Sequence, residues 1–201
     1  MNDKVKRLVN FVNSLNDFYI VQNIDGNYKN MGATIIDGIL QAGMTYKNCV
    51  KPRVDDFLNS YPDIIKTSQF ISLFEKEGIS SIINWKASVK TERITALSYF
   101  LKNEGVETTE EFGIWLEQDE NIKKLKLLSG IKCKTADYFR ILTGHQTNAV
   151  DRHLIAFIER SGSKVSNYQE AQIIISSAAR ELNIKEALFD HSIWKYMSEA
   201  K

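Results

Sequence analysis

Hydrophobic residues recur three and four positions apart along nearly the whole chain, which is the spacing of one face of an α-helix. Stripes of this kind fall near residues 5–15, 35–40, 50–58, 70–74, 94–101, 112–116, 168–182 and 185–197. Only two prolines and ten glycines interrupt the 201 residues, and no pair of alternating segments has the pattern of a β-hairpin. The sequence therefore predicts an all-α fold of about nine or ten short helices.

Local signals place several helix ends. Thr108 and Glu111 have the spacing of a capping box, so a helix is expected to begin there. Gly105 follows the stripe at 94–101 and is typical of a C-terminal stop, while Gly130 and Gly144 fit turns that need a positive φ. Neither a linker nor an internal repeat is evident, so residues 1–201 are expected to form a single unit.

Composition narrows the class of protein. Lys and Arg total 26 against 25 for Asp and Glu, which excludes a globally basic coat but leaves room for a local basic patch. The apolar runs are all far shorter than the roughly 20 residues that span a bilayer, and the charged first residues lead into no signal-like stretch. Two cysteines, Cys49 and Cys133, are too few for a four-cysteine iron–sulfur site. We expect a cytoplasmic, nucleoid-associated monomer with no membrane partner and no metal site.

The most informative segment runs from Leu128 to His153. It reads as a helix, a tight turn at Ser129-Gly130-Ile131-Lys132, a second helix, a loop and a third helix. Amide groups at such a turn and at the following helix N-terminus suit a DNA phosphate. Between Asn121 and Ala136, at and just before this turn, five positive charges with no acid among them form a local basic patch: Lys123, Lys124, Lys126, Lys132 and Lys134.

This segment resembles the signature of the helix-hairpin-helix DNA glycosylases (HhH-GPD) of the endonuclease III superfamily. The matching residues are Leu128, Gly130, Ile131, Lys134, Thr135, Ala136, Val150, Asp151 and His153. The resemblance implies two helical lobes around a central cleft, with a hairpin at 125–143. Lobe one would cover about residues 30–140, and lobe two about 1–29 plus 141–201. The iron–sulfur ligands of endonuclease III itself are absent, so no cluster is expected.

The resemblance also implies the chemistry. The family's catalytic lysine falls on Lys134 and its essential aspartate on Asp151. A neutral lysine amine can displace a damaged base at the sugar C1′ and form a Schiff base, and a carboxylate can stabilise the cationic sugar. The alternatives are a phosphate-contacting Lys134 and an Asp151 that only caps a helix. Lys132 stands where the family usually has a second hairpin glycine, and the step from Lys134 to Asp151 is 17 residues.

Contacts to damaged duplex DNA are expected from the hairpin and from an earlier segment. The hairpin residues are Gly130, Lys132, Cys133 and Thr135. Gln41 and Met44 occupy the place where the family inserts a residue into the gap left by the flipped base; a helix end capped at Gly43 is the alternative. The family often carries a monovalent ion on the hairpin backbone, and no other cofactor is expected.

A second resemblance concerns the lesion. Asp190 and Trp194 are four residues apart on one predicted helix face, and Lys201 follows. Short type 2 8-oxoguanine DNA glycosylases carry a similar aspartate, tryptophan and terminal lysine around the flipped base, which makes 8-oxoguanine the expected substrate. Ordinary helix and core roles for Asp190 and Trp194 are the alternative.

We therefore expect a base-excision glycosylase with AP-lyase activity by β-elimination. Another lesion (an alkylated purine, uracil or an oxidised pyrimidine) is one alternative. A non-catalytic helix-hairpin-helix DNA-binding module is the alternative of another class, and an unrelated helical interaction protein is the third.

Overall fold

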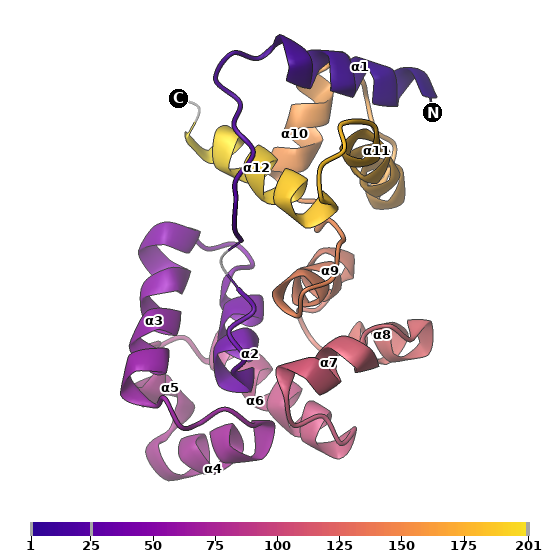
Figure 1. Ribbon diagram of the computed structural model, residues 1–201. Helices are drawn as coiled ribbons and strands as arrows, with labels where there is room; N and C mark the ends of the chain where they lie inside the picture. Colours follow the sequence, from indigo (N-terminus) through magenta and orange to yellow (C-terminus); the bar gives the residue numbers. More distant parts are fainter. Residues whose placement is uncertain (1, 25, 200–201) are drawn as a thin grey trace. The chain divides into compact units, whose positions relative to one another are not determined.

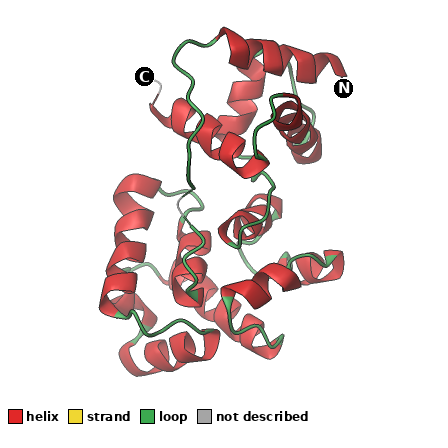
Figure 2. Ribbon diagram, in the orientation of Figure 1, coloured by secondary structure: helices red, strands yellow, loops and turns green. Residues whose placement is uncertain are grey.

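The computed structural model describes residues 2–24 and 26–199. Within these residues the chain forms twelve α-helices and one π-helix, connected by loops, with no strand (Figures 1 and 2). The all-α prediction is confirmed, whereas the predicted nine or ten helices were too few, because very short helices such as α5 leave little periodic signal. The chain divides into two compact units: a hairpin unit of residues 26–144 and a terminal unit of residues 1–25 and 145–201. The expected lobe boundaries, near 29/30 and 140/141, lie within five residues of these divisions.

The hairpin unit contains the helices α2 to α9. Their bounds are α2 (Met31–Leu40), the π-helix η1 (Tyr46–Val50), α3 (Lys51–Ser60), α4 (Thr67–Glu77), α5 (Ile79–Ile82), α6 (Ser88–Asn103), α7 (Thr109–Trp115), α8 (Asp119–Leu125) and α9 (Cys133–Leu142). Helix α2 is buried at every one of its residues and packs against α3, α4, α6 and α9. A helix that is buried all round lies at the centre of its unit.

Two glycines allow aromatic rings to reach the backbone of α2. A Cβ atom on Gly32 would lie 2.5 Å from the Phe57 ring, and one on Gly38 would lie 2.1 Å from the Phe139 ring. Real Cβ atoms do not approach other heavy atoms so closely. Gly38 therefore brings the backbone of α2 into direct contact with α9, the second helix of the hairpin.

The terminal unit contains α1 (Asn2–Ser14), α10 (Arg152–Arg160), α11 (Tyr168–Glu181) and α12 (Glu186–Glu199). Helix α1 packs on α11, and α10 packs on α12. Phe18 stacks on the fully buried Phe157 with ring centroids 5.4 Å apart, and Lys4 forms an ion pair of 2.6 Å with Glu170. The N-terminal segment thus joins helices that are encoded more than a hundred residues later.

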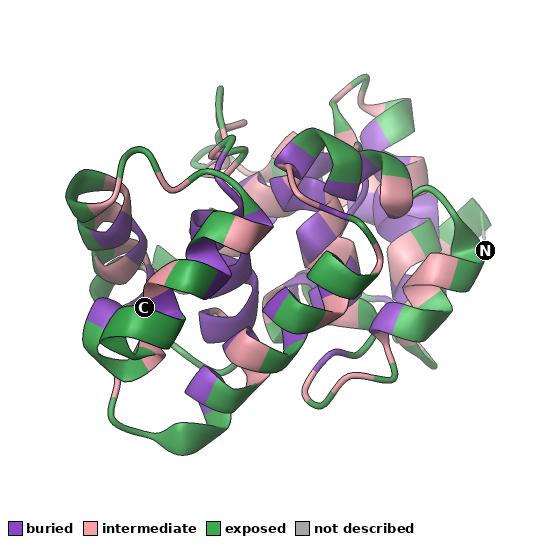
Figure 3. Ribbon diagram, turned by 90° about the horizontal axis from the view of Figure 1, so that it is seen from below, coloured by how far each residue is buried: buried purple, intermediate pink, exposed green. Residues whose placement is uncertain are grey.

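Most helices are buried along one side and exposed along the other (Figure 3), as their hydrophobic stripes predicted. The predicted capping box is confirmed, because the Thr108 hydroxyl accepts from the Glu111 amide and the Glu111 carboxylate accepts from the Thr108 amide. Gly105, Gly130 and Gly144 all have positive φ. In the described ranges no helix is both long enough and apolar enough to cross a lipid bilayer.

Candidate functional site

The hairpin turn joins α8 to α9 and depends on Gly130. Gly130 has φ +81°, a conformation that a residue with a side chain rarely adopts. A Cβ atom at this position would also lie 2.4 Å from Nε of Arg93, a residue of α6. The glycine is therefore required both for the turn and for the close approach of the Arg93 guanidinium.

Lys132 and the first turn of α9 follow this glycine. Lys132 is the N-cap of α9 and has extended backbone angles, with φ −122° and ψ −171°. A lysine fits there without strain, although the helix-hairpin-helix signature usually has glycine. The Lys132 side chain makes no capping bond to the helix. Cys133 is exposed, whereas Thr135 is buried, so the Thr135 side chain presents almost no surface to solvent.

Lys134 lies on the first turn of α9, directly beside the end of α2. Its Nζ donates a hydrogen bond to Oε1 of Gln41 and lies 5.3 Å from the centre of the Tyr138 ring. The structure therefore brings together two residues that are 93 positions apart and that the sequence assigned to separate roles. Met44, beyond the positive-φ Gly43, is 40 % exposed and also belongs to the segment that follows α2.

Lys90 is a second lysine in this part of the hairpin unit, and sequence reasoning missed it. It is only 8 % exposed, and its Nζ donates to the carbonyl oxygens of Ile39 at 2.6 Å and Ala42 at 2.8 Å. Carbonyls at a helix C-terminus have no partner within the helix, and a lysine can satisfy them. Burial, followed by repulsion from the charges of Arg93 and Lys134, lowers the pKa of Lys90 to about 8.

A buried carboxyl group lies one turn before the end of α2. Asp37 is fully buried, and its two oxygens accept hydrogen bonds from Tyr28 at 2.6 Å and Tyr138 at 3.1 Å. Burial, followed by the neighbouring Asp37, raises the pKa of Tyr28 far above its usual range. The bond to Asp37 holds the Tyr138 ring, which faces Lys134. The apolar spacing that predicted α2 gave no sign that Asp37 would be buried.

Asp151 belongs to the terminal unit and begins α10. One carboxylate oxygen, Oδ1, accepts from the amides of His153 at 2.8 Å and Leu154 at 3.1 Å. The predicted helix cap is therefore confirmed. The cap also fixes the orientation of the carboxyl group, which a catalytic role would equally need.

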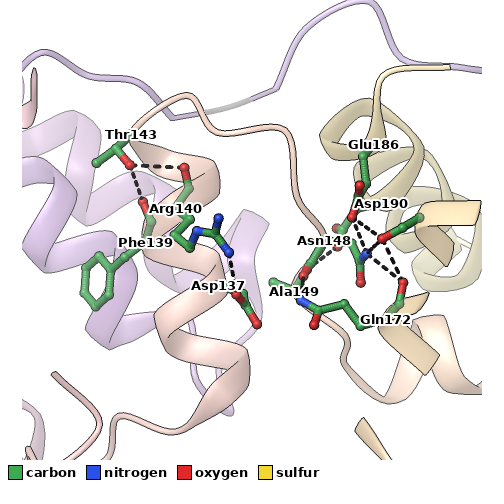
Figure 4. Close-up of polar contacts among 10 residues, drawn as sticks. Asp137, Phe139, Arg140, Thr143, Asn148, Ala149, Gln172, Glu186 and Asp190 are labelled. Carbon is green, nitrogen blue, oxygen red and sulfur yellow. Dashed lines mark hydrogen bonds and ion pairs between the residues drawn. The ribbon is translucent and has the colours of Figure 1, made fainter. Parts of the chain in front are cut away.

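The segment before Asp151 is fixed by a buried polar network (Figure 4). The fully buried Asn148 donates to the Gln172 carbonyl at 3.2 Å and to Glu186 at 2.6 Å, and Gln172 donates back to the Asn148 carbonyl at 3.1 Å. The amide of Ala149 donates to Asp190 at 2.7 Å. Hydrogen bonds to residues of α11 and α12 therefore fix the position of the backbone that leads into Asp151.

The residues expected around the flipped base fall in this same unit. Asp190 and Trp194 are half-buried on α12, and the Trp194 ring lies 5.5 Å from the ring of His191. The hydrogen bond from the Ala149 amide shows that Asp190 holds the backbone before Asp151, a contact that the sequence spacing did not reveal. Lys201 lies outside the described residues. The described residues contain no cluster of three or more His, Cys, Asp or Glu side chains that could hold a metal ion.

Residues 6–198 match a protein family described as "Domain of unknown function (DUF8548)". The chain belongs to this family. A comparison with curated proteins gives no match.

Two solved structures share the fold of this DUF8548 chain. One is 3-methyladenine DNA glycosylase (MagIII) from H. pylori bound to 1,N6-ethenoadenine, with 15 % identity, a TM-score of 0.56, and coverage of 98 % of this chain and 96 % of that one. The other is 8-oxoguanine glycosylase/lyase from Methanocaldococcus jannaschii in complex with a 15mer DNA containing 8-oxoguanine. It has 14 % identity, a TM-score of 0.54, and coverage of 99 % and 91 %.

These likenesses establish the fold class over nearly the full length of the chain. The expected helical glycosylase fold is confirmed. At such low identity the likeness shows the fold of the chain, whereas an activity depends on the chemistry of individual residues.

Proposed function

We propose that this protein is a base-excision DNA glycosylase with associated AP-lyase activity. Lys134 is the nucleophile, and Asp151 is the carboxylate that stabilises positive charge on the sugar. The observation that carries the proposal is the setting of Lys134. It lies on the first turn of the hairpin's second helix, bonded to Gln41, four residues after the positive-φ Gly130.

The reaction assigns a definite task to each group. The Lys134 amine attacks C1′ of the damaged nucleotide, the C1′–N bond breaks, and the base leaves with its bonding electrons. The amine loses a proton and the departing base gains one. Opening of the sugar ring gives a Schiff base. Loss of a C2′ proton then expels the 3′ phosphate by β-elimination, and water hydrolyses the imine to release the lysine.

Asp151 suits its part of the reaction because its position is fixed before DNA binds. The helix amides hold Oδ1, and the network around Asn148 holds the preceding backbone. A preorganised carboxylate stabilises a developing cation more effectively than one that must reorient. Lys134 belongs to the hairpin unit and Asp151 to the terminal unit.

Contacts to damaged duplex DNA are assigned to the hairpin and to the end of α2. Lys132, the exposed Cys133 and the amides at the start of α9 would bind the phosphate backbone, which suits a helix N-terminus. Gln41 and Met44 would enter the space left by the flipped nucleotide. Because Gln41 already accepts from Lys134, displacement of a base by Gln41 would be coupled to the position of the nucleophile.

The preferred lesion within this proposal is 8-oxoguanine, on the spacing of Asp190 and Trp194. The Asp190 carboxylate accepts a hydrogen bond from the Ala149 amide. Asp190 therefore helps to hold the segment that leads into Asp151, and it lies next to that segment. An alkylated purine is the second candidate, since one protein of similar fold is described with bound 1,N6-ethenoadenine.

Duplexes that each carry one lesion test the proposal: 8-oxoguanine, 1,N6-ethenoadenine, thymine glycol or uracil, with an undamaged duplex as control. We expect release of 8-oxoguanine, strand nicking without alkali, and a covalent adduct when borohydride is added. Lys134→Gln should abolish the adduct, whereas Lys76→Gln, a change of an exposed lysine on α4, should not.

Each other outcome has a definite meaning. Nicking only after alkaline treatment would identify a glycosylase without lyase activity. Release of another base alone would replace 8-oxoguanine as the substrate. Salt-sensitive binding with no base release from any duplex would identify a non-catalytic DNA-binding module and refute the enzymatic assignment.

A further inference from the structure

Lys90 and Lys134 both lie at the C-terminal end of α2, but they differ in burial and in hydrogen-bond partners. Lys90 is buried and holds two carbonyl oxygens, Ile39 O and Ala42 O, at 2.6 and 2.8 Å. Its lone pair would therefore be unavailable without breaking both bonds. Lys134 is half-buried and donates to a side-chain amide oxygen, that of Gln41, which can move away. Of the two lysines, only Lys134 is placed to act as a nucleophile.

The two carbonyls that Lys90 holds lie on either side of Gln41. Ile39 is in the last turn of α2, and Ala42 follows Gln41 directly. By binding both carbonyl oxygens, the Lys90 ammonium stabilises the turn from which the Gln41 side chain reaches Lys134. This turn is also held against α9 by the contact between Gly38 and the Phe139 ring.

Repulsion between the two ammonium groups is mutual. The charge of Lys134 contributes to the lowered pKa of Lys90, which is about 8, so Lys90 is mostly charged at neutral pH. A charged neighbour favours the neutral form of a second amine, which is one of the ways in which proteins activate a lysine nucleophile.

Other titratable groups also face these two lysines. Arg93, on the same helix as Lys90, lowers the pKa of Lys90 through its positive charge, whereas Cys49 of η1 raises it. Tyr138 faces Lys134 and bonds to Asp37 of α2. None of these residues changes when Lys90 is substituted, so their influence is constant across the comparison.

We propose that Lys90 is a positioning residue that holds Gln41 against Lys134 and, through its positive charge, raises the fraction of Lys134 in the neutral form that attacks the sugar. The inference rests on the proposed lyase function. It assigns the reactivity of Lys134 at neutral pH to a buried lysine 44 residues earlier in the chain, whose spacing carries no motif.

The experiment uses the full chain and a duplex with one abasic site, so the choice of lesion does not matter. The amine condenses with the sugar aldehyde and releases water, and cyanoborohydride reduces the resulting C=N bond to a stable adduct. The rate of adduct formation is measured from about pH 6 to about pH 10. Digestion with trypsin and mass spectrometry identify the modified lysine.

We expect the adduct on Lys134. At neutral pH, Lys90→Met should react about tenfold more slowly than the unchanged protein, the change in amine fraction that follows from one unit of pKa. The two rates should converge toward about pH 10, where the amine forms in either protein. Lys90→Arg keeps the charge and should retain most of the neutral-pH rate. Lys76→Met serves as a control and should not alter the profile.

Several results would overturn the inference. An adduct on Lys90 would show that Lys90, and not Lys134, is the reacting amine. A Lys90→Met rate that is reduced equally at every pH would show that the charge of Lys90 does not act on Lys134. Acetic anhydride labelling of Lys134 against pH, without DNA, separates this failure from that of the proposed function. If no protein forms an adduct but the labelling midpoint of Lys134 rises in Lys90→Met, the coupling stands and the lyase assignment fails. An unchanged midpoint would refute the coupling itself.

Discussion

Replacing Gly38 by alanine tests the packing that brings the nucleophile to the end of α2. An added Cβ atom would lie 2.1, 2.4 and 2.8 Å from Cε1, Cζ and Cδ1 of the Phe139 ring. The ring is fully buried and packs edge-on against Phe112 with centroids 5.5 Å apart, so it cannot move aside freely. The substitution therefore forces α2 and α9 apart.

The magnitude follows from two opposing effects. Alanine is favoured over glycine in a helix interior by about 1 kcal/mol. Overpacking a filled core costs about 1–3 kcal/mol and sometimes more, and the overlap at Gly38 is at the severe end because three ring atoms are involved. We expect Gly38→Ala to lower the free energy of unfolding by about 2 kcal/mol. For a chain of this size that corresponds to a fall in melting temperature of about 4–8 °C.

Differential scanning calorimetry measures this change, and a second substitution isolates its cause. Phe139→Leu should destabilise the protein by itself, but combined with Gly38→Ala the loss should be smaller than the sum of the two, because the shorter side chain makes room for the Cβ atom. Gly43→Ala adds a Cβ atom in open space and should show only the cost of a positive φ, about 1 kcal/mol. A Gly38→Ala protein as stable as the original, or additive losses in the double variant, would refute this account of the α2–α9 contact.

Three further predictions concern the terminal unit. Asp151→Ala should lower the stability by about 1 kcal/mol through loss of the α10 cap, whereas Asp151→Asn should keep the stability and lose base release; equal loss of stability in both would contradict the assignment. The ion pair with Lys4 lowers the pKa of Glu170 to about 2, so its stabilising contribution is complete above the ordinary pKa of 4.5 and is lost as the pH falls toward 2. Glu170→Gln should therefore flatten the fall in melting temperature over that acid range. Asn148→Leu should destabilise by about 2 kcal/mol, because it leaves the partners of a buried amide unsatisfied, and urea unfolding would measure it.

Sequence reasoning succeeded where structure depends on nearby residues. The capping box at Thr108 and Glu111, the cap at Asp151 and the positive φ of Gly130 each rest on residues a few positions apart. Such features are encoded locally, and the same is true of the hairpin motif that pointed to the fold.

Sequence reasoning failed where the hydrogen-bond partner of a residue is distant in the sequence. Lys90 bonds to carbonyls 48 and 51 residues away, and Asp37 bonds to Tyr138, 101 residues away. A charged residue in an apolar stripe is usually solvated, so nothing in its own neighbourhood predicts burial. The π-helix at 46–50 was also missed, because its backbone bonding has no distinctive hydrophobic period.

The division of the chain has a consequence for its biosynthesis. Residues 26–144 are continuous, so the ribosome completes the hairpin unit before any of α10 to α12 has been translated. Helix α1 is made first, yet the helix it packs on, α11, comes more than a hundred and fifty residues later. Its apolar face, Val5, Leu8 and Val12, must stay uncovered throughout that interval. We expect this nascent segment to be a binding site for chaperones until α11 emerges.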